Sequence, residues 1–291
     1  MRSASSPPSG ARCEMLAPMT TLTARLVGGP TAVLEYAGLR WLTDPTFSPP
    51  GDYEGGLVKT TGPAIEPDAI GPIDVVLLSH DHHADNLDPE GRAFLPRATR
   101  VLTTAAGAQR LGGDAIGLEP WTSVEIPRPD GGAVTVTAVP AQHGPDGTDE
   151  ITGPVIGFVL EGEGIERVYV SGDNASLDVV RTIAERVGPA DVAVLFAGAV
   201  SIPQIFGGAY LTLSSERAAQ AAELLGARAV VPVHFEGWGH FTQGAAELRA
   251  AFAGYGVSDR LALPERGGDG YRLTYSRRGP PDARDRDTVG P

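Results

Sequence analysis

One short stretch of the chain concentrates side chains that can hold a metal ion. Three histidines and two aspartates follow an apolar run within six positions: His80, Asp81, His82, His83 and Asp85. Imidazole nitrogens and carboxylate oxygens are ligands for Zn²⁺, iron and Mn²⁺. Because the whole chain contains six histidines, three of them in four positions favour a metal site over a polar loop that faces solvent.

Three more residues of these types stand where an apolar run ends. His143, Asp173 and His234 each follow a run of aliphatic residues that predicts a buried strand. A lone histidine is usually solvated and a Gly-Asp pair usually forms a turn, so each position alone is weak evidence. Together they indicate one site, because strand ends at one edge of a pair of sheets converge and a rigid sheet holds each ligand in place.

The order of the predicted elements indicates how these strands are arranged. The first half of the chain is mostly strands, at 21–27, 32–36, 40–43, 75–79, 100–103, 122–126 and 133–139, with one helix at 105–111. In the second half, strands at 155–160, 167–170, 191–196, 229–233, 261–263 and 271–275 accompany helices at 176–187, 212–225 and 242–253. This order favours an α+β fold of two sheets packed face to face with helices outside.

The charge and the cysteine count exclude several classes of protein. The formal net charge is −13, which disfavours a nucleic-acid partner. The single cysteine, Cys13, excludes an internal disulfide and a zinc site built from cysteines. No apolar run reaches the ~18 residues of a membrane span, and the N-terminus lacks a secretory apolar region. We predict a cytoplasmic protein with a small-molecule substrate, and we leave self-association into a homo-oligomer open.

These motifs resemble those of the metallo-β-lactamase superfamily, from about Thr21 to Tyr275. The resemblance is carried by Asp44-Pro45, Ser79-His80-Asp81-His82, His143, Ser171-Gly172-Asp173 and Pro232-Val233-His234. Within the superfamily, the chain is most similar to the branch of the ascorbate-6-phosphate lactonases and the N-acyl-phosphatidylethanolamine phospholipases D. The resemblance implies a four-layer αββα sandwich and metal-dependent hydrolysis.

In that family the motif His-x-His-x-Asp-His supplies ligands to two metal ions. The resemblance implies two sets of ligands that share one carboxylate: His80, His82 and His143 for the first ion, Asp85 and His234 for the second, and Asp173 between them. Zn²⁺ is the expected metal, as one ion or two, and Mn²⁺ or iron would also suit these ligands.

The chain departs from the family motif in two places. One extra residue lies between His82 and Asp85, and Asn86 stands where the motif has its last histidine. An amide is a poor metal ligand, so we expect one tight site and a second that fills only when metal is abundant.

The extra residue, His83, leaves the choice of ligand open. His83 could be a ligand itself, or it could pair with Asp81 while His82 turns away. In another alignment of the motif, Asp81 and His83 are the first two ligands. We prefer the alignment that starts at His80, because His80 follows directly on the apolar strand, where the family has its first histidine.

Other features near the motif have two interpretations each. Asp44 ends a predicted strand and either forms a turn or orients a metal ligand. His240 is either a surface-loop residue or a pocket residue that contacts substrate or donates a proton. The Pro/Gly-rich loop 48–56 is of a kind that borders a pocket, and the loop 201–210 either caps the site or only connects elements.

We expect a metal-dependent hydrolase of the lactonase or phosphodiesterase type. A bound metal lowers the pKa of water to about 7 and polarises the reacting oxygen of a lactone, ester or phosphodiester. Asp85 or Asp173 would position the water and take its proton. The alternatives are a non-catalytic binding or sensor protein with a degenerate metal site, and redox chemistry at iron.

The two ends of the chain differ in composition from the middle. Residues 1–18 are rich in Ser, Pro, Gly and Arg, and residues 277–291 are charged and rich in Pro. Both compositions are typical of disordered segments. We predict a disordered leader at 1–18, a metallo-hydrolase domain at 19–276 and a disordered tail at 277–291, with Met1 and Met19 both open as the start.

Overall fold

The computed structural model describes residues 20–275. The predicted leader at 1–18 and the predicted tail at 277–291 lie outside the described residues, as do Cys13 and Met19. Among residues 20–275, no helix has the length and apolar character needed to cross a membrane.

The first sheet has seven strands in the order β15-β1-β2-β3-β6-β7-β8. Their bounds, in that order, are Tyr271–Tyr275, Thr20–Gly28, Thr31–Tyr36, Leu39–Thr43, Ile73–Leu77, Ala98–Thr104 and Ile116–Leu118. Strands β3, β6, β7 and β8 run parallel, and Thr43 pairs with Leu77 where β3 and β6 end. The residues that follow β3 and β6 are therefore neighbours at one edge of the sheet.

The second sheet has six strands in the order β14-β13-β12-β11-β10-β9. Their bounds, in that order, are Ala229–Val233, Val192–Phe196, Val168–Val170, Ile156–Glu161, Ala133–Pro140 and Ser123–Pro127. Strands β12, β13 and β14 are parallel, and β10 runs in the same direction because β11 is antiparallel to both β10 and β12. The strands that precede His143, Asp173 and His234 therefore all end at the same edge.

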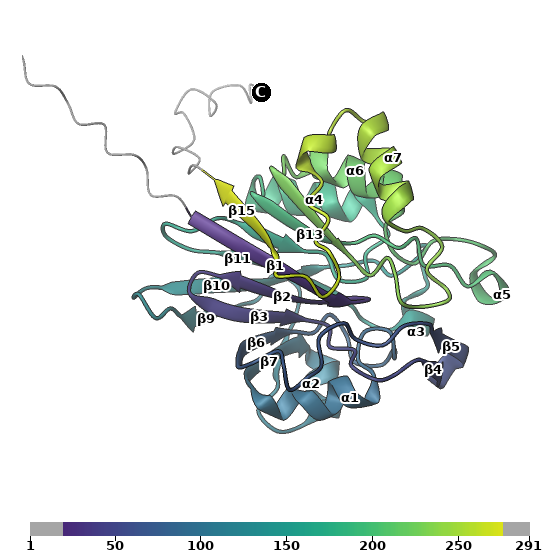
Figure 1. The fold of residues 1–291 in the computed structure, drawn as a ribbon, viewed down its shortest axis with the longest axis horizontal. Helices are drawn as coiled ribbons and strands as arrows, with labels where there is room; N and C mark the ends of the chain where they lie inside the picture. Colours follow the sequence, from purple (N-terminus) through teal and green to yellow (C-terminus); the bar gives the residue numbers. More distant parts are fainter. Residues whose placement is uncertain (1–19, 276–291) are drawn as a thin grey trace, which may run out of the picture.

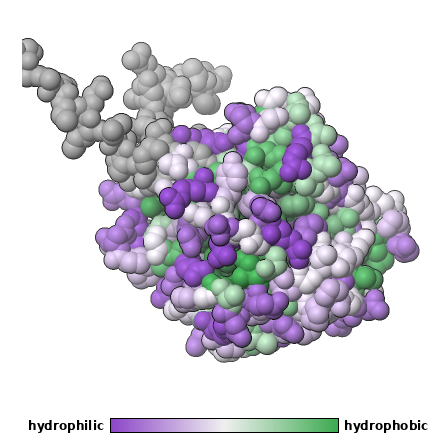
Figure 2. Space-filling model, viewed as in Figure 1, coloured by the Kyte–Doolittle hydropathy of each residue, from purple (hydrophilic) through white to green (hydrophobic). Residues whose placement is uncertain are grey.

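Helices cover the outer side of each sheet, so the molecule has four layers (Figure 1). Helices α1 (Pro89–Phe94) and α2 (Ala105–Leu111) lie on the side of the first sheet. Helices α4 (Leu177–Val187), α6 (Ser215–Leu224) and α7 (Ala245–Gly254) lie on the side of the second. This arrangement confirms the predicted α+β sandwich of αββα type. Hydrophilic residues cover much of the face shown in Figure 2, with hydrophobic residues in patches between them.

The hydrophobic core fills the space between the two sheets and continues between the first sheet and the helices on its outer side. Trp41 and Phe158 are fully buried in the larger cluster, to which both sheets contribute. A smaller cluster contains Phe94 of α1. Strand β6 supplies both clusters, since Val75 belongs to the larger and Val76 to the smaller. Burial on both faces explains why the sequence before the histidines is continuously apolar.

Helix ends follow local capping chemistry. The Ser176 side chain accepts a hydrogen bond from the Val179 N–H and starts α4, and Gly188 ends it. Helix α6 begins later than predicted, at Ser215, because the Ser214 side chain caps it by accepting from the Arg217 N–H.

The sequence did not predict several short elements, some of which lie near the site. These are β4 (Gly51–Tyr53), β5 (Leu57–Lys59), α3 (Asp149–Thr152), α5 (Pro203–Phe206) and the 3₁₀ turns Glu54–Gly56, Leu95–Arg97 and Ser258–Arg260. The predicted strand at 261–263 is wrong. Its backbone makes one isolated bridge, between Leu261 and Val230, which is too short a pairing to form a ladder.

Candidate metal centre

The candidate ligands lie at the edge where the strands of both sheets end. The loop after β6 carries His80, His82, His83 and Asp85, while the ends of β10, β12 and β14 supply His143, Asp173 and His234. His80, Asp173 and His234 are fully buried, and His143 and Asp85 are nearly so. The seven side chains lie in two groups that share Asp173, one around His80 and one around His234, with His82 in the first group beside His80 and His83.

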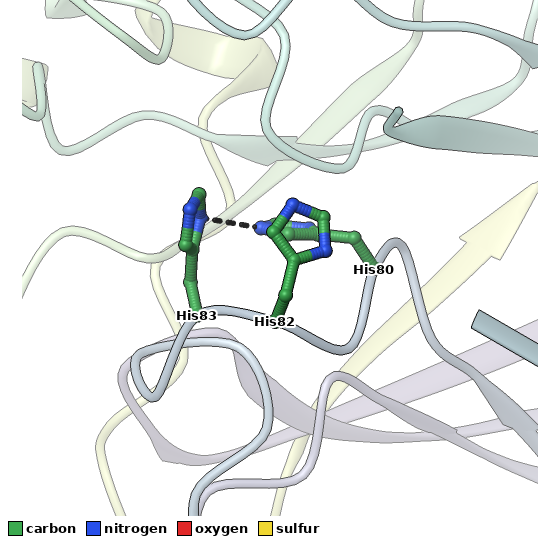
Figure 3. A group of neighbouring side chains, drawn as sticks. All are labelled: His80, His82 and His83. Carbon is green, nitrogen blue, oxygen red and sulfur yellow. Dashed lines mark hydrogen bonds between the residues drawn. The ribbon is translucent and has the colours of Figure 1, made fainter. Parts of the chain in front are cut away.

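The first group is built around His80. The His80 Nε2 lies 2.9 Å from the Nδ1 of His83, and a dashed line marks this contact in Figure 3. The Nδ1–H of His143 is aimed at the Leu211 carbonyl oxygen, 2.8 Å away, and its Nε2 lies 3.5 Å from Oδ2 of Asp173. Ligand atoms of His80, His143 and Asp173 all lie within 4.8 Å of one another. The backbone contact of His143 fixes its ring so that Nε2 faces the other ligands.

His82 is held differently from its two neighbours. Its Nε2 lies 2.5 Å from the carbonyl oxygen of Thr152 in α3, so this nitrogen donates to the backbone. A Cβ at Gly153 would lie 2.2 Å from the same nitrogen, so glycine is needed for this approach. The side chain of His82 is 25% exposed. Its ring still lies within 4.8 Å of ligand atoms of His80 and His83, and its predicted role as a ligand stays a prediction.

The second group contains two carboxylates and one imidazole. The Nε2 of His234 lies 3.4 Å from Oδ2 of Asp85 and 3.6 Å from Oδ1 of Asp173. The backbone of His234 has φ +57°, which is uncommon for a residue with a side chain, and its N–H donates to the Gly29 carbonyl at 2.7 Å. The Nε2 of His240 lies 2.8 Å from the same Oδ2 of Asp85.

Asn86 occupies the space between two buried carboxylates. Its amide donates to Asp44 at 2.9 Å and to Asp173 at 3.2 Å. Asp44 also accepts from the N–H of Ser79 at 2.7 Å and from its hydroxyl at 2.5 Å. The Ser79 hydroxyl oxygen is in turn 2.9 Å from Nδ1 of His80. Asp44 therefore orients His80 through Ser79, and the sequence had not marked Ser79 for this role.

Burial and neighbouring charges shift the pKa values of the candidate ligands and so decide which of them are charged near pH 7. Burial raises the pKa of Asp173 to about 7. Burial would also raise the pKa of Asp85, but His240 and His234 beside it hold that pKa well below its usual range. Burial and neighbouring imidazoles lower the pKa of His80 well below its usual value, and burial lowers that of His83 to about 4. These imidazoles are therefore neutral near pH 7 and keep a lone pair for a metal.

The donors present fit a metal ion. Oδ2 of Asp173 and both ring nitrogens of His234 are buried and make no hydrogen bond within residues 20–275. Leaving such atoms unpaired costs stability, and metal ions bound to Oδ2 of Asp173 and to one ring nitrogen of His234 would satisfy those two atoms. Ligands at the Zn–N and Zn–O distances of proteins stand about 3.3 Å apart in a tetrahedron. The contacts of Asp173 with His143 and His234 and of His234 with Asp85 measure 3.5, 3.6 and 3.4 Å.

A pocket of about 290 Å³ opens onto the two groups. His82, His83, Asp85, His143 and His240 line it. Both predicted loops contribute, 48–56 through Glu54 and Gly55 and 201–210 through Ile202, Ile205 and Phe206. His240 lies among these lining residues, and its predicted contact with substrate or role as a proton donor stays a prediction. A larger cavity of about 920 Å³ lies beside α4, and none of the candidate ligands line it.

Fold and site together define a metallo-hydrolase of the αββα type, and comparison with known proteins identifies the superfamily. Residues 40–235 match the beta-lactamase superfamily domain, so the chain belongs to that superfamily. A metal-dependent hydrolase of Methanosphaerula palustris is 31% identical over 201 residues, which are 67% of this chain and 83% of that protein. The chain is a metal-dependent hydrolase of this superfamily, as predicted, while the particular branch stays a prediction.

Two solved structures show the same fold. An isothiocyanate hydrolase from Delia radicum gut bacteria superimposes with a TM-score of 0.73 at 20% identity, over 88% of this chain and 100% of that one. CmlA, a diiron β-hydroxylase from Streptomyces venezuelae, superimposes with a TM-score of 0.60 at 19% identity, over 89% of this chain and 55% of that one. At such identities the likeness concerns the fold alone.

Proposed function

We propose that the chain hydrolyses a lactone, an ester or a phosphodiester at two metal positions that share Asp173. His80, His83 and His143 hold the first position, and Asp85 and His234 hold the second. The observation that carries this proposal is the buried Asp173 carboxylate, whose two oxygens lie 3.5 Å from Nε2 of His143 and 3.6 Å from Nε2 of His234. Zn²⁺ suits this mixture of imidazole and carboxylate, and Mn²⁺ or iron would also fit it.

Metal ions held there would supply an activated water and would polarise the oxygen on which charge develops. The chain's own residues orient the reactants and move the proton. Asp85 faces the pocket as a carboxylate and would orient the water, and the pair that it forms with His240 takes the proton that the water loses. The Nε2–H of His240 donates to Oδ2 of Asp85 across 2.8 Å, so this pair would hold the proton until the leaving oxygen takes it.

The test is turnover by the chain before and after its metal is removed. Purified protein is stripped with a chelator, reloaded with Zn²⁺, Mn²⁺ or Fe²⁺, and assayed on lactones, esters and phosphodiesters. We expect hydrolysis that disappears on stripping and returns with one of these metals. Full metal occupancy with no turnover of any substrate would instead support a binding or sensor protein. An iron-loaded protein that consumes O₂ would support redox chemistry of the kind that the name of CmlA indicates.

A further inference from the structure

The residues that line the pocket also indicate the chemical character of the part of the substrate that does not react. We propose that this substrate is a neutral ester or lactone with a small apolar body, and that Ile151 and Ile205 contact that body. The inference rests on the proposed hydrolase function and narrows it, since it excludes phosphodiesters and substrates with an anionic body.

Apolar side chains from separate segments meet around the pocket. Ile205 and Phe206 belong to α5, Ile151 to α3, and Leu57 to β5. Figure 1 shows these three elements at the same end of the sandwich. Ile205 is 58% exposed and Ile151 is 63% exposed, although isoleucine is among the residues most often buried in proteins. Two exposed isoleucines at the mouth of one apolar pocket indicate a surface that a ligand covers.

Apart from the metal ions that the site would hold, the charges around the pocket oppose an anion. Within residues 20–275, the pocket lining contains no Lys or Arg, and Glu54 is its one acidic side chain besides Asp85. Nearby cations are already paired, since Lys59 Nζ lies 2.8 Å from Asp88 and Arg110 Nη2 lies 2.5 Å from Asp81. Recognition of a phosphate or carboxylate group generally uses Arg or Lys. The net charge of −13 also repels anions from the surface.

The reaction on such a substrate balances without any other reactant. The oxygen of water forms a bond to the carbonyl carbon, and the bond from that carbon to the ester oxygen breaks. One water proton passes through the Asp85–His240 pair to the leaving oxygen. The products are a carboxylic acid and an alcohol, or one hydroxy acid from a lactone. The volume of about 290 Å³ lies at the lower end of small-molecule pockets, so a short chain or a single ring suits it.

The test uses three compounds that release the same 4-nitrophenol. These are 4-nitrophenyl butyrate, 4-nitrophenyl 3-sulfopropionate, whose sulfonate does not attack its own ester, and bis(4-nitrophenyl) phosphate. With each kcat/KM of the metal-loaded protein divided by that compound's rate constant for hydrolysis without protein, we expect the value for the butyrate to be at least about tenfold above that for either anion, the low end of what pocket contacts discriminate. A higher value for either anionic compound would overturn the inference and leave the proposed function standing. No hydrolysis of any of the three by the metal-loaded protein would count against both.

Substitutions at Ile205 and Ile151 test whether these two side chains contact the substrate. Ile205→Lys and Ile151→Lys place a cation at the mouth, and their exposure means that neither change disturbs the core. We expect each to raise KM for the butyrate about tenfold and to lower KM for the 3-sulfopropionate, with kcat little changed. Val58→Lys is the matched control, because Val58 is 44% exposed on β5 but does not line the pocket. Equal KM effects of all three variants, or no effect of the Ile205 and Ile151 changes, would contradict the assigned contacts. Circular dichroism confirms that each variant is folded.

Discussion

At the scale of single residues, the site differs from the family motif in the histidine whose ring nitrogen contacts Nε2 of His80. The motif places His82 there, and the structure places His83 there. The extra residue in the loop brings His83 to His80, while His82 turns to the backbone of α3. The sequence raised this exchange as one of its alternatives but could not choose. The choice depends on the path of the loop and on Gly153, which lies 71 positions after His82 in the chain and lets its ring approach.

Because His83 rather than His82 contacts Nε2 of His80, alanine substitutions of these two histidines should affect metal binding unequally. His83→Ala removes a proposed ligand and should weaken binding of the first metal ion about 100-fold, at or above the loss seen when an outer partner of a ligand is removed. His82→Ala removes a side chain whose Nε2 is bonded to Thr152, and it should weaken binding less than tenfold. Competition with a chromophoric chelator measures both affinities. A larger loss in His82→Ala than in His83→Ala would show that His82 is the ligand.

Asn86 shows the same limit of sequence reasoning. Its type indicated a lost ligand, and the structure adds that its amide bridges Asp44 and Asp173. That bridge joins residues from three separate strand ends. No local pattern in the sequence could indicate it, because the partners meet only after both sheets have formed.

At the scale of elements, the sequence predicted apolar strands but did not predict the shortest helices. Strand β14 was predicted at Ala229–Val233, the bounds that the structure has. Helices α3 and α5 have four residues each, which is too short for a hydrophobic period to be visible. Both line the pocket, so the elements that shape substrate binding are the ones that the sequence indicated least.

Close packing of β13 against β14 should make Gly198 essential for the second metal position. A Cβ at Gly198 would lie 2.1 Å from the carbonyl oxygen of His234. Gly198→Ala should therefore push His234 aside, lower the free energy of unfolding by about 1–3 kcal/mol, and weaken the second metal position. Denaturant unfolding and metal titration measure the two effects.

Gly254 offers a matched control for this substitution. It ends α7, and a Cβ there would meet no atom within 4 Å. Gly254→Ala should raise stability by up to about 1 kcal/mol and leave metal binding unchanged. Equal metal affinity in Gly198→Ala and Gly254→Ala would refute the proposed link between Gly198 and His234.

At the scale of the whole molecule, the direction of the strands brings the site together. The sequence predicted that apolar strands ending in ligand-type residues would converge, and β10, β12 and β14 do end at one edge. The hydrophobic core behind this edge also contains a polar group, the Tyr169 hydroxyl, that does not stabilise the fold. The hydroxyl of Tyr169 is fully buried and makes no hydrogen bond within the described part of the chain.

Removing that hydroxyl should stabilise the fold. Tyr169→Phe keeps the ring and should raise the free energy of unfolding by about 1–3 kcal/mol. Burial raises the pKa of Tyr169 above its usual value of about 10. The unfolded chain therefore ionises first, and the parent loses stability as the pH rises above about 10. The variant should lose less over that range. Urea unfolding at pH 8 and pH 11 measures this, and lower stability of the variant at pH 8 would reveal a partner for the hydroxyl.

The central claim is that two metal positions share Asp173, and calorimetric titration of the metal-free chain with Zn²⁺ tests it most directly. We predict two ions per chain, the first bound more tightly because three imidazoles hold it. Asp173→Asn, which keeps the size of the side chain and removes its charge, should weaken both binding steps. A parent that binds a single ion at saturation, or an Asp173→Asn variant that binds two ions as tightly as the parent, would contradict the shared site.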